Sequence, residues 1–179
     1  MRQLHAILIL LFLAGPLPSF AQNTVKKEAL IWYTNLEQAQ KLSNSSHKPI
    51  FGFFTGSDWC GWCRKLQNDV FAKAEFIKWA KEKVILLELD FPRNKQLPAE
   101  LAQQNNNLQQ AFKVTGYPTV WLFYLNKDEA AKKMTITALG SLGYPGGAEQ
   151  GKEQVKFLND ANTILANNKA ENNKNKKGA

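Results

Sequence analysis

Runs of unbroken apolar residues alternate along this chain with segments in which apolar residues recur every three or four positions. The first pattern is typical of strands covered on both faces of a sheet, and the second is typical of amphipathic helices. The patterns predict strands at residues 29–33, 50–54, 84–89, 119–125 and, as a loosely alternating edge strand, 132–139. They predict helices at 35–42, from Cys60 onward, and at 74–81, 99–112 and 149–166, with loops at 43–48 and 140–147.

The order of these elements indicates the fold class. Strands and helices alternate until the last two strands, which follow each other directly and form a hairpin before the final helix. Such an order favours an α/β domain with a mixed central sheet and helices on both of its faces. We expect this single domain to cover residues 29–166, and we expect it to be a monomer.

A different pattern precedes the domain. A positively charged start is followed by an apolar run at 4–12, a break at 16–18 and small residues at Ser19 and Ala21. This is the pattern of a secretory signal peptide, so we expect residues 1–21 to be cleaved and 22–28 to form a flexible lead-in. The apolar run is short for a membrane-spanning helix, although a retained N-terminal anchor is the alternative.

The charge of the chain adds little to this picture. The formal net charge is +8, and part of it lies outside the domain, in Arg2 and in the lysine- and asparagine-rich segment 167–179. We expect this segment to be a disordered basic tail, with weak attraction to an anionic surface as the functional alternative. No basic face interleaved with aromatic residues is evident, so we expect no nucleic-acid partner.

The two cysteines indicate the chemistry. Cys60 and Cys63 are the only cysteines, and they lie where a buried strand passes through a short turn into a helix. A helix start offers free backbone N–H groups and the positive end of the dipole, both of which favour a thiolate. A disulfide across so short a loop would stabilise the fold little, which indicates a reactive pair. We expect Cys60 to be an exposed nucleophile and Cys63 a shielded resolving thiol.

Two motifs together resemble the thioredoxin superfamily. The first is Trp59-Cys60-Gly61-Trp62-Cys63 after a buried strand, and the second is Gly116-Tyr117-Pro118-Thr119 ahead of a later strand. The chain most resembles exported thioredoxin-like proteins with a site of the SDWCxxC type. The resemblance implies a thioredoxin-like fold and a cis Pro118 beside the cysteines, with the backbone of Tyr117 pairing with an extended substrate.

The resemblance also implies an exported thiol–disulfide oxidoreductase without a cofactor, in the bacterial periplasm or secreted. Its partners would be protein or peptide thiols and disulfides, together with a membrane or soluble thiol reductant. Trp59, Gly61, Trp62, Tyr117 and Pro118 are the expected substrate-binding residues. Trp62 departs from the more familiar residue pairs between the cysteines and leaves the redox direction open, with the reductase direction favoured.

A second departure from the family concerns the proton of Cys63. Thioredoxins carry a buried aspartate in the strand before the site, but residues 51–54 of this chain contain no acid. Asp58 is expected in the turn and solvated. Water or Glu88 is left to accept the proton.

Other function classes remain open from the sequence. A zinc site needs four ligands, and beyond the two cysteines the domain offers only His47, so we expect no metal. Two thiolates can suffice for a copper(I) carrier. A binding or chaperone module without redox turnover is the main alternative, because a fold does not by itself imply activity.

Overall fold

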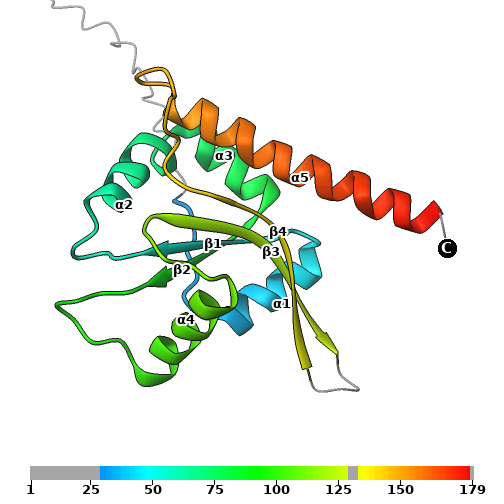
Figure 1. Cartoon of the computed structure of the whole chain (residues 1–179), viewed down its shortest axis with the longest axis horizontal. Helices are drawn as coiled ribbons and strands as arrows, with labels where there is room; N and C mark the ends of the chain where they lie inside the picture. Colours follow the sequence, from blue (N-terminus) through cyan, green and yellow to red (C-terminus); the bar gives the residue numbers. More distant parts are fainter. Residues whose placement is uncertain (1–28, 129–132, 178–179) are drawn as a thin grey trace, which may run out of the picture.

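The computed structural model of the protein describes residues 29–128 and 133–177, so the predicted signal peptide 1–21 and lead-in 22–28 lie outside the described residues (Figure 1). In chain order the elements are α1 (Leu36–Ser46), β1 (Ile50–Thr55), α2 (Gly61–Leu66), the π-helix η1 (Gln67–Phe71), α3 (Ala74–Lys83), β2 (Ile85–Asp90), α4 (Ala99–Ala111), β3 (Thr119–Asp128), β4 (Lys133–Leu142) and α5 (Glu153–Lys177).

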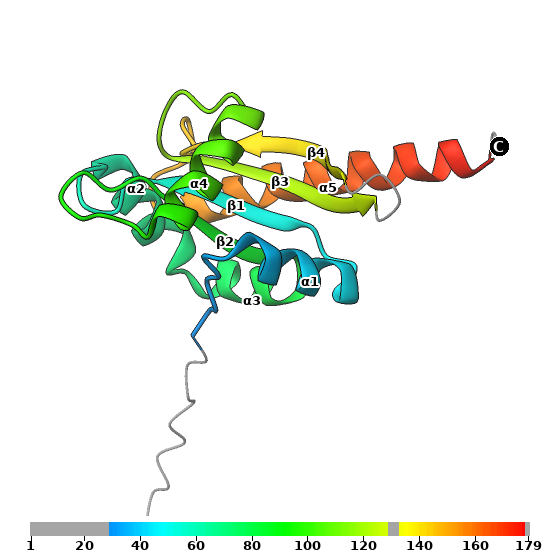
Figure 2. The same ribbon diagram turned by 90° about the horizontal axis from the view of Figure 1, so that it is seen from below.

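A mixed four-stranded sheet lies at the centre of the molecule. Its strand order is β2-β1-β3-β4, with β1 and β2 parallel and the remaining pairs antiparallel. In Figure 1, α3 and α5 lie above the sheet and α1 and α4 lie below it, and Figure 2, seen from below, shows α1 and α4 in front of the strands and α5 behind them. The predicted fold class, an α/β domain with a mixed sheet and helices on both faces, is confirmed.

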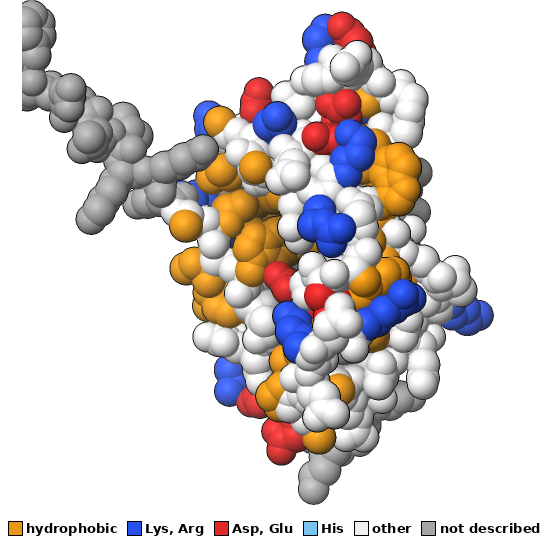
Figure 3. All heavy atoms as spheres, turned by 90° about the vertical axis from the view of Figure 1, so that its left-hand side faces the viewer, with side chains coloured by type: hydrophobic (Ala, Val, Ile, Leu, Met, Phe, Trp, Pro, Cys, Tyr) orange, Lys and Arg blue, Asp and Glu red, His pale blue; other side chains and the backbone are white. Residues whose placement is uncertain are grey.

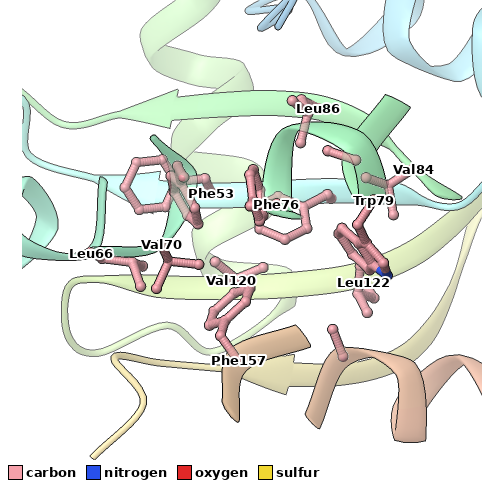
Figure 4. Close-up of a cluster of buried hydrophobic side chains, with 14 of the residues drawn as sticks. Phe53, Leu66, Val70, Phe76, Trp79, Val84, Leu86, Val120, Leu122 and Phe157 are labelled. Atoms are coloured by element: carbon pink, nitrogen blue, oxygen red, sulfur yellow. The ribbon is translucent and has the colours of Figure 1, made fainter. Parts of the chain in front are cut away.

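The larger core fills the space between the sheet and α2, α3 and α5. Phe51 and Phe53 of β1 point to this side, where they meet buried side chains from all three helices (Figure 4). The ring centroid of Phe51 lies 5.7 Å from that of Phe76 in α3 and 6.2 Å from that of Phe157 in α5. Cys63 and Leu66 belong to the same cluster, so the helix that carries the cysteines is fixed directly on the sheet.

A second core lies on the opposite face of the sheet. Phe54 of β1 and Leu89 of β2 contribute to it, and Leu108 of α4 and Ala39 of α1 cover it. Because β1 feeds both cores, all six of its residues are buried. This accounts for the unbroken apolar run by which the strand is recognised in the sequence.

The predicted strand at 29–33 is not a strand. Only Tyr33 pairs with β2, through an isolated parallel bridge in which its N–H donates to Leu86 and its carbonyl accepts from Glu88. Ile31 is 67% exposed, whereas Trp32 joins the larger core. The chain then turns at once into α1, which is capped by Asn35, and this leaves no length for a strand.

The helix α1 is longer than the predicted 35–42. It continues through the serine- and asparagine-rich segment as far as Ser46, where His47 ends it in the left-handed conformation. The Ser46 hydroxyl donates to the Leu42 carbonyl at 2.6 Å, so the serine bonds back onto the helix. A loop was predicted here because serine and asparagine side chains often bond to the backbone in turns. In this segment the Ser46 hydroxyl bonds to a carbonyl within the helix instead.

The C-terminal half also departs from the prediction. β4 continues through Gly140 to Leu142, although a loop was predicted from residue 140. A Cβ at Gly140 would lie 2.9 Å from Ile164, so the glycine lets α5 pack close to the strand. The helix was expected to end at residue 166, but α5 continues to Lys177, and Asn168 donates to the Leu139 carbonyl of β4. Residues 167–177, predicted to be disordered, are therefore helical.

Among residues 29–128 and 133–177, no helix combines the length and the apolar character needed to cross a membrane.

The packing of α5 on the sheet gives a test of the larger core. Phe157 is 1% exposed and Val155, on the same helix, is 44% exposed. Replacing Phe157 by alanine should lower the free energy of unfolding by about 3–5 kcal/mol, because a buried ring is removed and a cavity remains. Val155→Ala should change it by no more than about 0.5 kcal/mol. Urea denaturation of both variants checks this, and equal losses would mean that α5 is not part of the core.

Candidate active site

The two cysteines lie at the start of α2 and are joined by a disulfide. Their Cα atoms are 5.3 Å apart. Cys60 is the N-cap of the helix, and its sulfur accepts a hydrogen bond from the backbone N–H of Cys63 at 3.1 Å. In the reduced protein, the same N–H and the helix start would favour a thiolate on Cys60 over one on Cys63.

The expected difference in exposure between the cysteines is small. Cys60 is only 4% exposed and Cys63 is 1% exposed, so the expectation of an exposed Cys60 is wrong for the disulfide form. Trp59 and Tyr117, from the two motifs singled out in the sequence, pack against the cluster that contains both cysteines. Cys60 is therefore part of the larger core and not an open surface thiol.

The turn before the cysteines depends on Gly56. The N–H groups of Trp59 and Cys60 both donate to the Gly56 carbonyl, at 3.2 and 2.8 Å. A Cβ at Gly56 would lie 2.3 Å from the indole of Trp59, so a larger residue would push the ring away. The indole N–H of Trp59 donates to the Phe91 carbonyl at 2.8 Å, which fixes the ring against the segment that follows β2.

Asp90 fixes this turn through hydrogen bonds to Ser57. Sequence reasoning missed it as a site residue. Its carboxylate accepts from the N–H and the hydroxyl of Ser57 at 2.8 and 2.7 Å, and Lys95 lies 3.0 Å away. Asn105 of α4 donates to its backbone carbonyl. The signal was present in the sequence: Asp90 ends a strand parallel to β1, and the carboxyl ends of parallel strands meet at one edge of a sheet.

Asp58 fixes the same turn through hydrogen bonds to the backbone of the segment after β2. Its carboxylate accepts from the backbone N–H groups of Asn94, at 2.7 Å, and of Arg93. The bond from Asn94 is the main cause that lowers the pKa of Asp58 below its ordinary value. The Arg93 guanidinium lies 3.9 Å from the ring centroid of Trp59. Asp58 lies in the turn and stays partly exposed to solvent, as expected, and its hydrogen bonds also tie the turn to residues 93 and 94.

The second predicted motif lies beside the first. The Tyr117–Pro118 peptide bond is cis, in agreement with the resemblance. The ring of Tyr117 meets that of Trp59 edge-on at 5.6 Å, and its hydroxyl accepts from Gln109 of α4 at 2.7 Å. The two motifs, far apart in the sequence, are therefore in direct contact through these rings.

Gly61 and Trp62, between the cysteines, are on the surface. Trp62 is 59% exposed, and a Cβ added to Gly61 would meet no atom within 4 Å. The ring of Trp62 meets that of Tyr144 at 5.1 Å, a contact that sequence reasoning did not anticipate. In Figure 3, which views the molecule from the side on which α2 lies in Figure 1, hydrophobic side chains gather among scattered lysines and arginines.

Glu88 lies on the face of the sheet that carries the cysteine cluster. It pairs in register with Phe53, and paired residues point to the same side of a sheet. Phe53 belongs to the cluster that contains Cys63. Burial is the main cause that raises the pKa of Glu88 above its ordinary value, and the nearby charge of Asp90 adds to it.

The third ligand that a zinc site would need is distant. His47 precedes β1 and the cysteines follow it, so they lie at opposite ends of that strand. Within the described part of the chain, no three His, Cys, Asp or Glu side chains gather into a group that could hold a metal ion.

Comparisons with known proteins agree with this arrangement. Residues 36–134 match the family model of the thioredoxin-like domain. "Disulfide bond reductase DsbH" of Chlamydia pneumoniae is 40% identical over 129 residues, which cover 72% of each chain. "Thioredoxin-related protein DsbJ" of the same organism is 28% identical over 80% of this chain, although the match covers only 39% of DsbJ.

Solved structures show the same fold. A DsbH oxidoreductase structure superposes with a TM-score of 0.63 at 29% identity, covering 86% of this chain and 96% of that one. A thioredoxin from Thermus thermophilus superposes with a TM-score of 0.53 at 14% identity, which shows a shared fold only. The chain belongs to the thioredoxin-like family.

Proposed function

We propose that this protein is an exported thiol–disulfide oxidoreductase that acts on protein disulfides through Cys60 and Cys63. Homology to DsbH and DsbJ and the cysteine pair support thiol–disulfide exchange as its activity. The observation that carries the proposal is the position of the pair. The sulfur of Cys60 caps α2, and Tyr117 from the second motif packs against the cluster that holds both cysteines.

The chemistry proceeds in two exchange steps. The Cys60 thiolate attacks a substrate disulfide, which forms a mixed disulfide and releases one substrate sulfur as a thiolate. Cys63 then loses its proton and attacks the Cys60 sulfur, which closes the Cys60–Cys63 disulfide and releases the second substrate thiol. The substrate gains two electrons, and a membrane or soluble thiol reductant must return two electrons to the protein.

The surface around the pair would hold the substrate. Trp59 and Trp62 flank Cys60 with aromatic area, and Gly61 leaves open space between them. Tyr117 and Pro118 lead into β3, and an extended substrate segment would lie along their backbone. These five residues form the proposed substrate-binding surface.

One relative favours the reductase direction. DsbH carries the name of a disulfide bond reductase, and it is 40% identical to this chain over the matched residues. We extend that direction to this protein as a proposal. The alternative is a binding or chaperone module, which would keep the surface and lack turnover.

Export and a periplasmic location belong to the same proposal. They rest on the leader pattern of residues 1–21 and on the bacterial relatives. The domain would act as a monomer outside the cytoplasm, where disulfides form and persist.

Separate serine substitutions test the roles of the two cysteines. Cys60→Ser should abolish reduction of a protein disulfide, because the attacking sulfur is lost. Cys63→Ser should also prevent turnover, but it should accumulate a mixed disulfide with the substrate, since nothing resolves it. Mass spectrometry of the trapped species, with the double variant as a control, distinguishes the two. A Cys60→Ser variant that still forms mixed disulfides would contradict the assigned roles.

The reduction potential of the pair tests the direction. Equilibration of the mature protein with dithiothreitol or glutathione buffers should give a value near the reducing end of the family range, about −270 mV. A value near the oxidising end, about −120 mV, would instead indicate an oxidant or isomerase.

Glu88 is the proposed proton acceptor for Cys63. Glu88→Gln should slow the resolution step by about a hundredfold, the lower end of the range for a positioned general base. In the wild type the rate should rise with pH as Glu88 loses its proton. Because burial raises its pKa, this limb should lie above the pH expected for an exposed glutamate. Stopped-flow measurement of the resolution step in both proteins checks this.

Glu82 on α3 provides the matched control, because it is an exposed glutamate. Glu82→Gln should leave both the rate and the pH profile unchanged. A Glu88→Gln variant with the wild-type profile would show that water accepts the proton.

A further inference from the structure

Trp62 presents a large apolar surface at the mouth of the site. It is 59% exposed although it lies between the two cysteines, which are nearly buried. Its ring meets that of Tyr144 at 5.1 Å with an interplanar angle of 63°, close to the edge-to-face geometry that aromatic pairs prefer. Tyr144 comes from the segment between β4 and α5, far from the cysteines in the sequence.

Tyr144 is held in place by charged groups on the helix that follows the cysteines. Its hydroxyl donates to Asp69 Oδ2 at 2.7 Å, and Lys65 Nζ lies 2.5 Å from the same oxygen. The Lys65 ammonium also lies 5.2 Å from the ring centroid of Tyr144. One carboxylate oxygen therefore joins a lysine of α2 to the tyrosine of a distant segment.

The path of the backbone brings these groups together. Asp69 lies in the π-helix η1, which directly continues α2. A π-helix is a rare conformation that occurs frequently at functional sites. Lys65 and Asp69 are four residues apart and form an ion pair on the side of the helix that faces Tyr144. The ion pair lowers the pKa of Asp69 and raises that of Lys65, so both stay charged at neutral pH.

The segment that carries Tyr144 also borders the second motif. A Cβ added to Gly143 would lie 3.8 Å from the carbonyl oxygen of Pro118, so this part of the chain is in contact with the residues proposed to align a substrate. Tyr144 therefore follows a residue that lies close to Pro118, and its partner Trp62 lies between Cys60 and Cys63 in the sequence.

We propose that Trp62 and Tyr144 form an aromatic subsite that binds an apolar or aromatic side chain next to the reactive cysteine of an extended substrate. Lys65 and Asp69 are positioning residues that hold Tyr144 and, through it, the ring of Trp62. This subsite rests on the proposed oxidoreductase function and adds a substrate preference to it.

The charges around the subsite favour an uncharged occupant. The acid that contacts Tyr144 is Asp69, and the positive charge of Lys65 balances its negative charge. A charged substrate side chain would gain no ion pair here without breaking the one that exists. An aromatic side chain would instead cover part of the exposed ring of Trp62, where removal of apolar area from water is favourable.

Two matched peptide substrates test the subsite. Each has one internal disulfide, and the two differ only in having phenylalanine or alanine beside the cysteine that is attacked. The measured quantity is the ratio of kcat/KM for the phenylalanine peptide to that for the alanine peptide. A ratio is used because substitution of Trp62 can also change the reduction potential, which affects both peptides equally.

The wild-type ratio should be about tenfold, the range expected for one added aromatic contact. Trp62→Ala should bring the ratio close to one. Tyr144→Phe keeps the ring and removes its hydrogen bond, and Asp69→Asn removes the charge, so each should lower the ratio by roughly threefold. The loss should appear in KM for the phenylalanine peptide.

Asp160→Asn is the matched control for Asp69→Asn. Asp160 forms an ion pair with Lys156 at 2.7 Å, also four residues apart, on α5. Its replacement should leave the wild-type ratio unchanged. If Asp160→Asn lowers the ratio as much as Asp69→Asn does, the proposed positioning role is wrong.

The outcomes separate the subsite from the function. Wild-type protein that reduces both peptides equally, or Trp62→Ala protein that keeps the wild-type ratio, overturns the subsite and leaves the oxidoreductase function intact. Wild-type protein that reduces neither peptide nor a linear small disulfide such as oxidised glutathione overturns the function itself, and the subsite with it.

Discussion

Burial of β1 on both of its faces is the constraint on which the rest of the structure depends. Its phenylalanines supply both hydrophobic cores, so the strand cannot shift without opening each of them. A shift of one residue would send every side chain to the wrong face. Because the strand leads within a few residues to Cys60, the position of the disulfide is set by the packing of the whole domain.

Hydrogen bonds to two carboxylates fix the turn between the strand and the cysteines. Asp90 binds Ser57 from the end of β2, and Asp58 binds the backbone of residues 93 and 94. Charged acceptors of this kind form stronger hydrogen bonds than neutral ones. The two carboxylates therefore tie the turn to the end of β2 and to the segment that follows it, and that segment also accepts the indole N–H of Trp59.

The parts of this molecule that could be predicted are those in which sequence-local pattern and fold agree. The apolar runs of β1 and β2 and the cysteines at the start of α2 lie where the pattern placed them. The errors fall where contacts distant in sequence decide the outcome. Asn168 of α5 donates a hydrogen bond to β4, and Gly140 of β4 lets α5 pack closely on the strand. Both elements therefore extend through residues whose composition favours loops. Tyr144 could not be assigned to the site without knowing that the segment after β4 lies beside α2.

The burial of Cys60 has a consequence for how electrons reach the protein. In the disulfide form its sulfur belongs to a residue that is only 4% exposed, in a cluster against which the rings of Trp59 and Tyr117 pack. Thiol–disulfide exchange depends on access to the attacked sulfur as well as on the strength of the attacking thiol. In the proposed cycle, a donor thiol on a narrow, projecting segment would therefore reach the sulfur, and an equally reducing thiol on a broad surface would not.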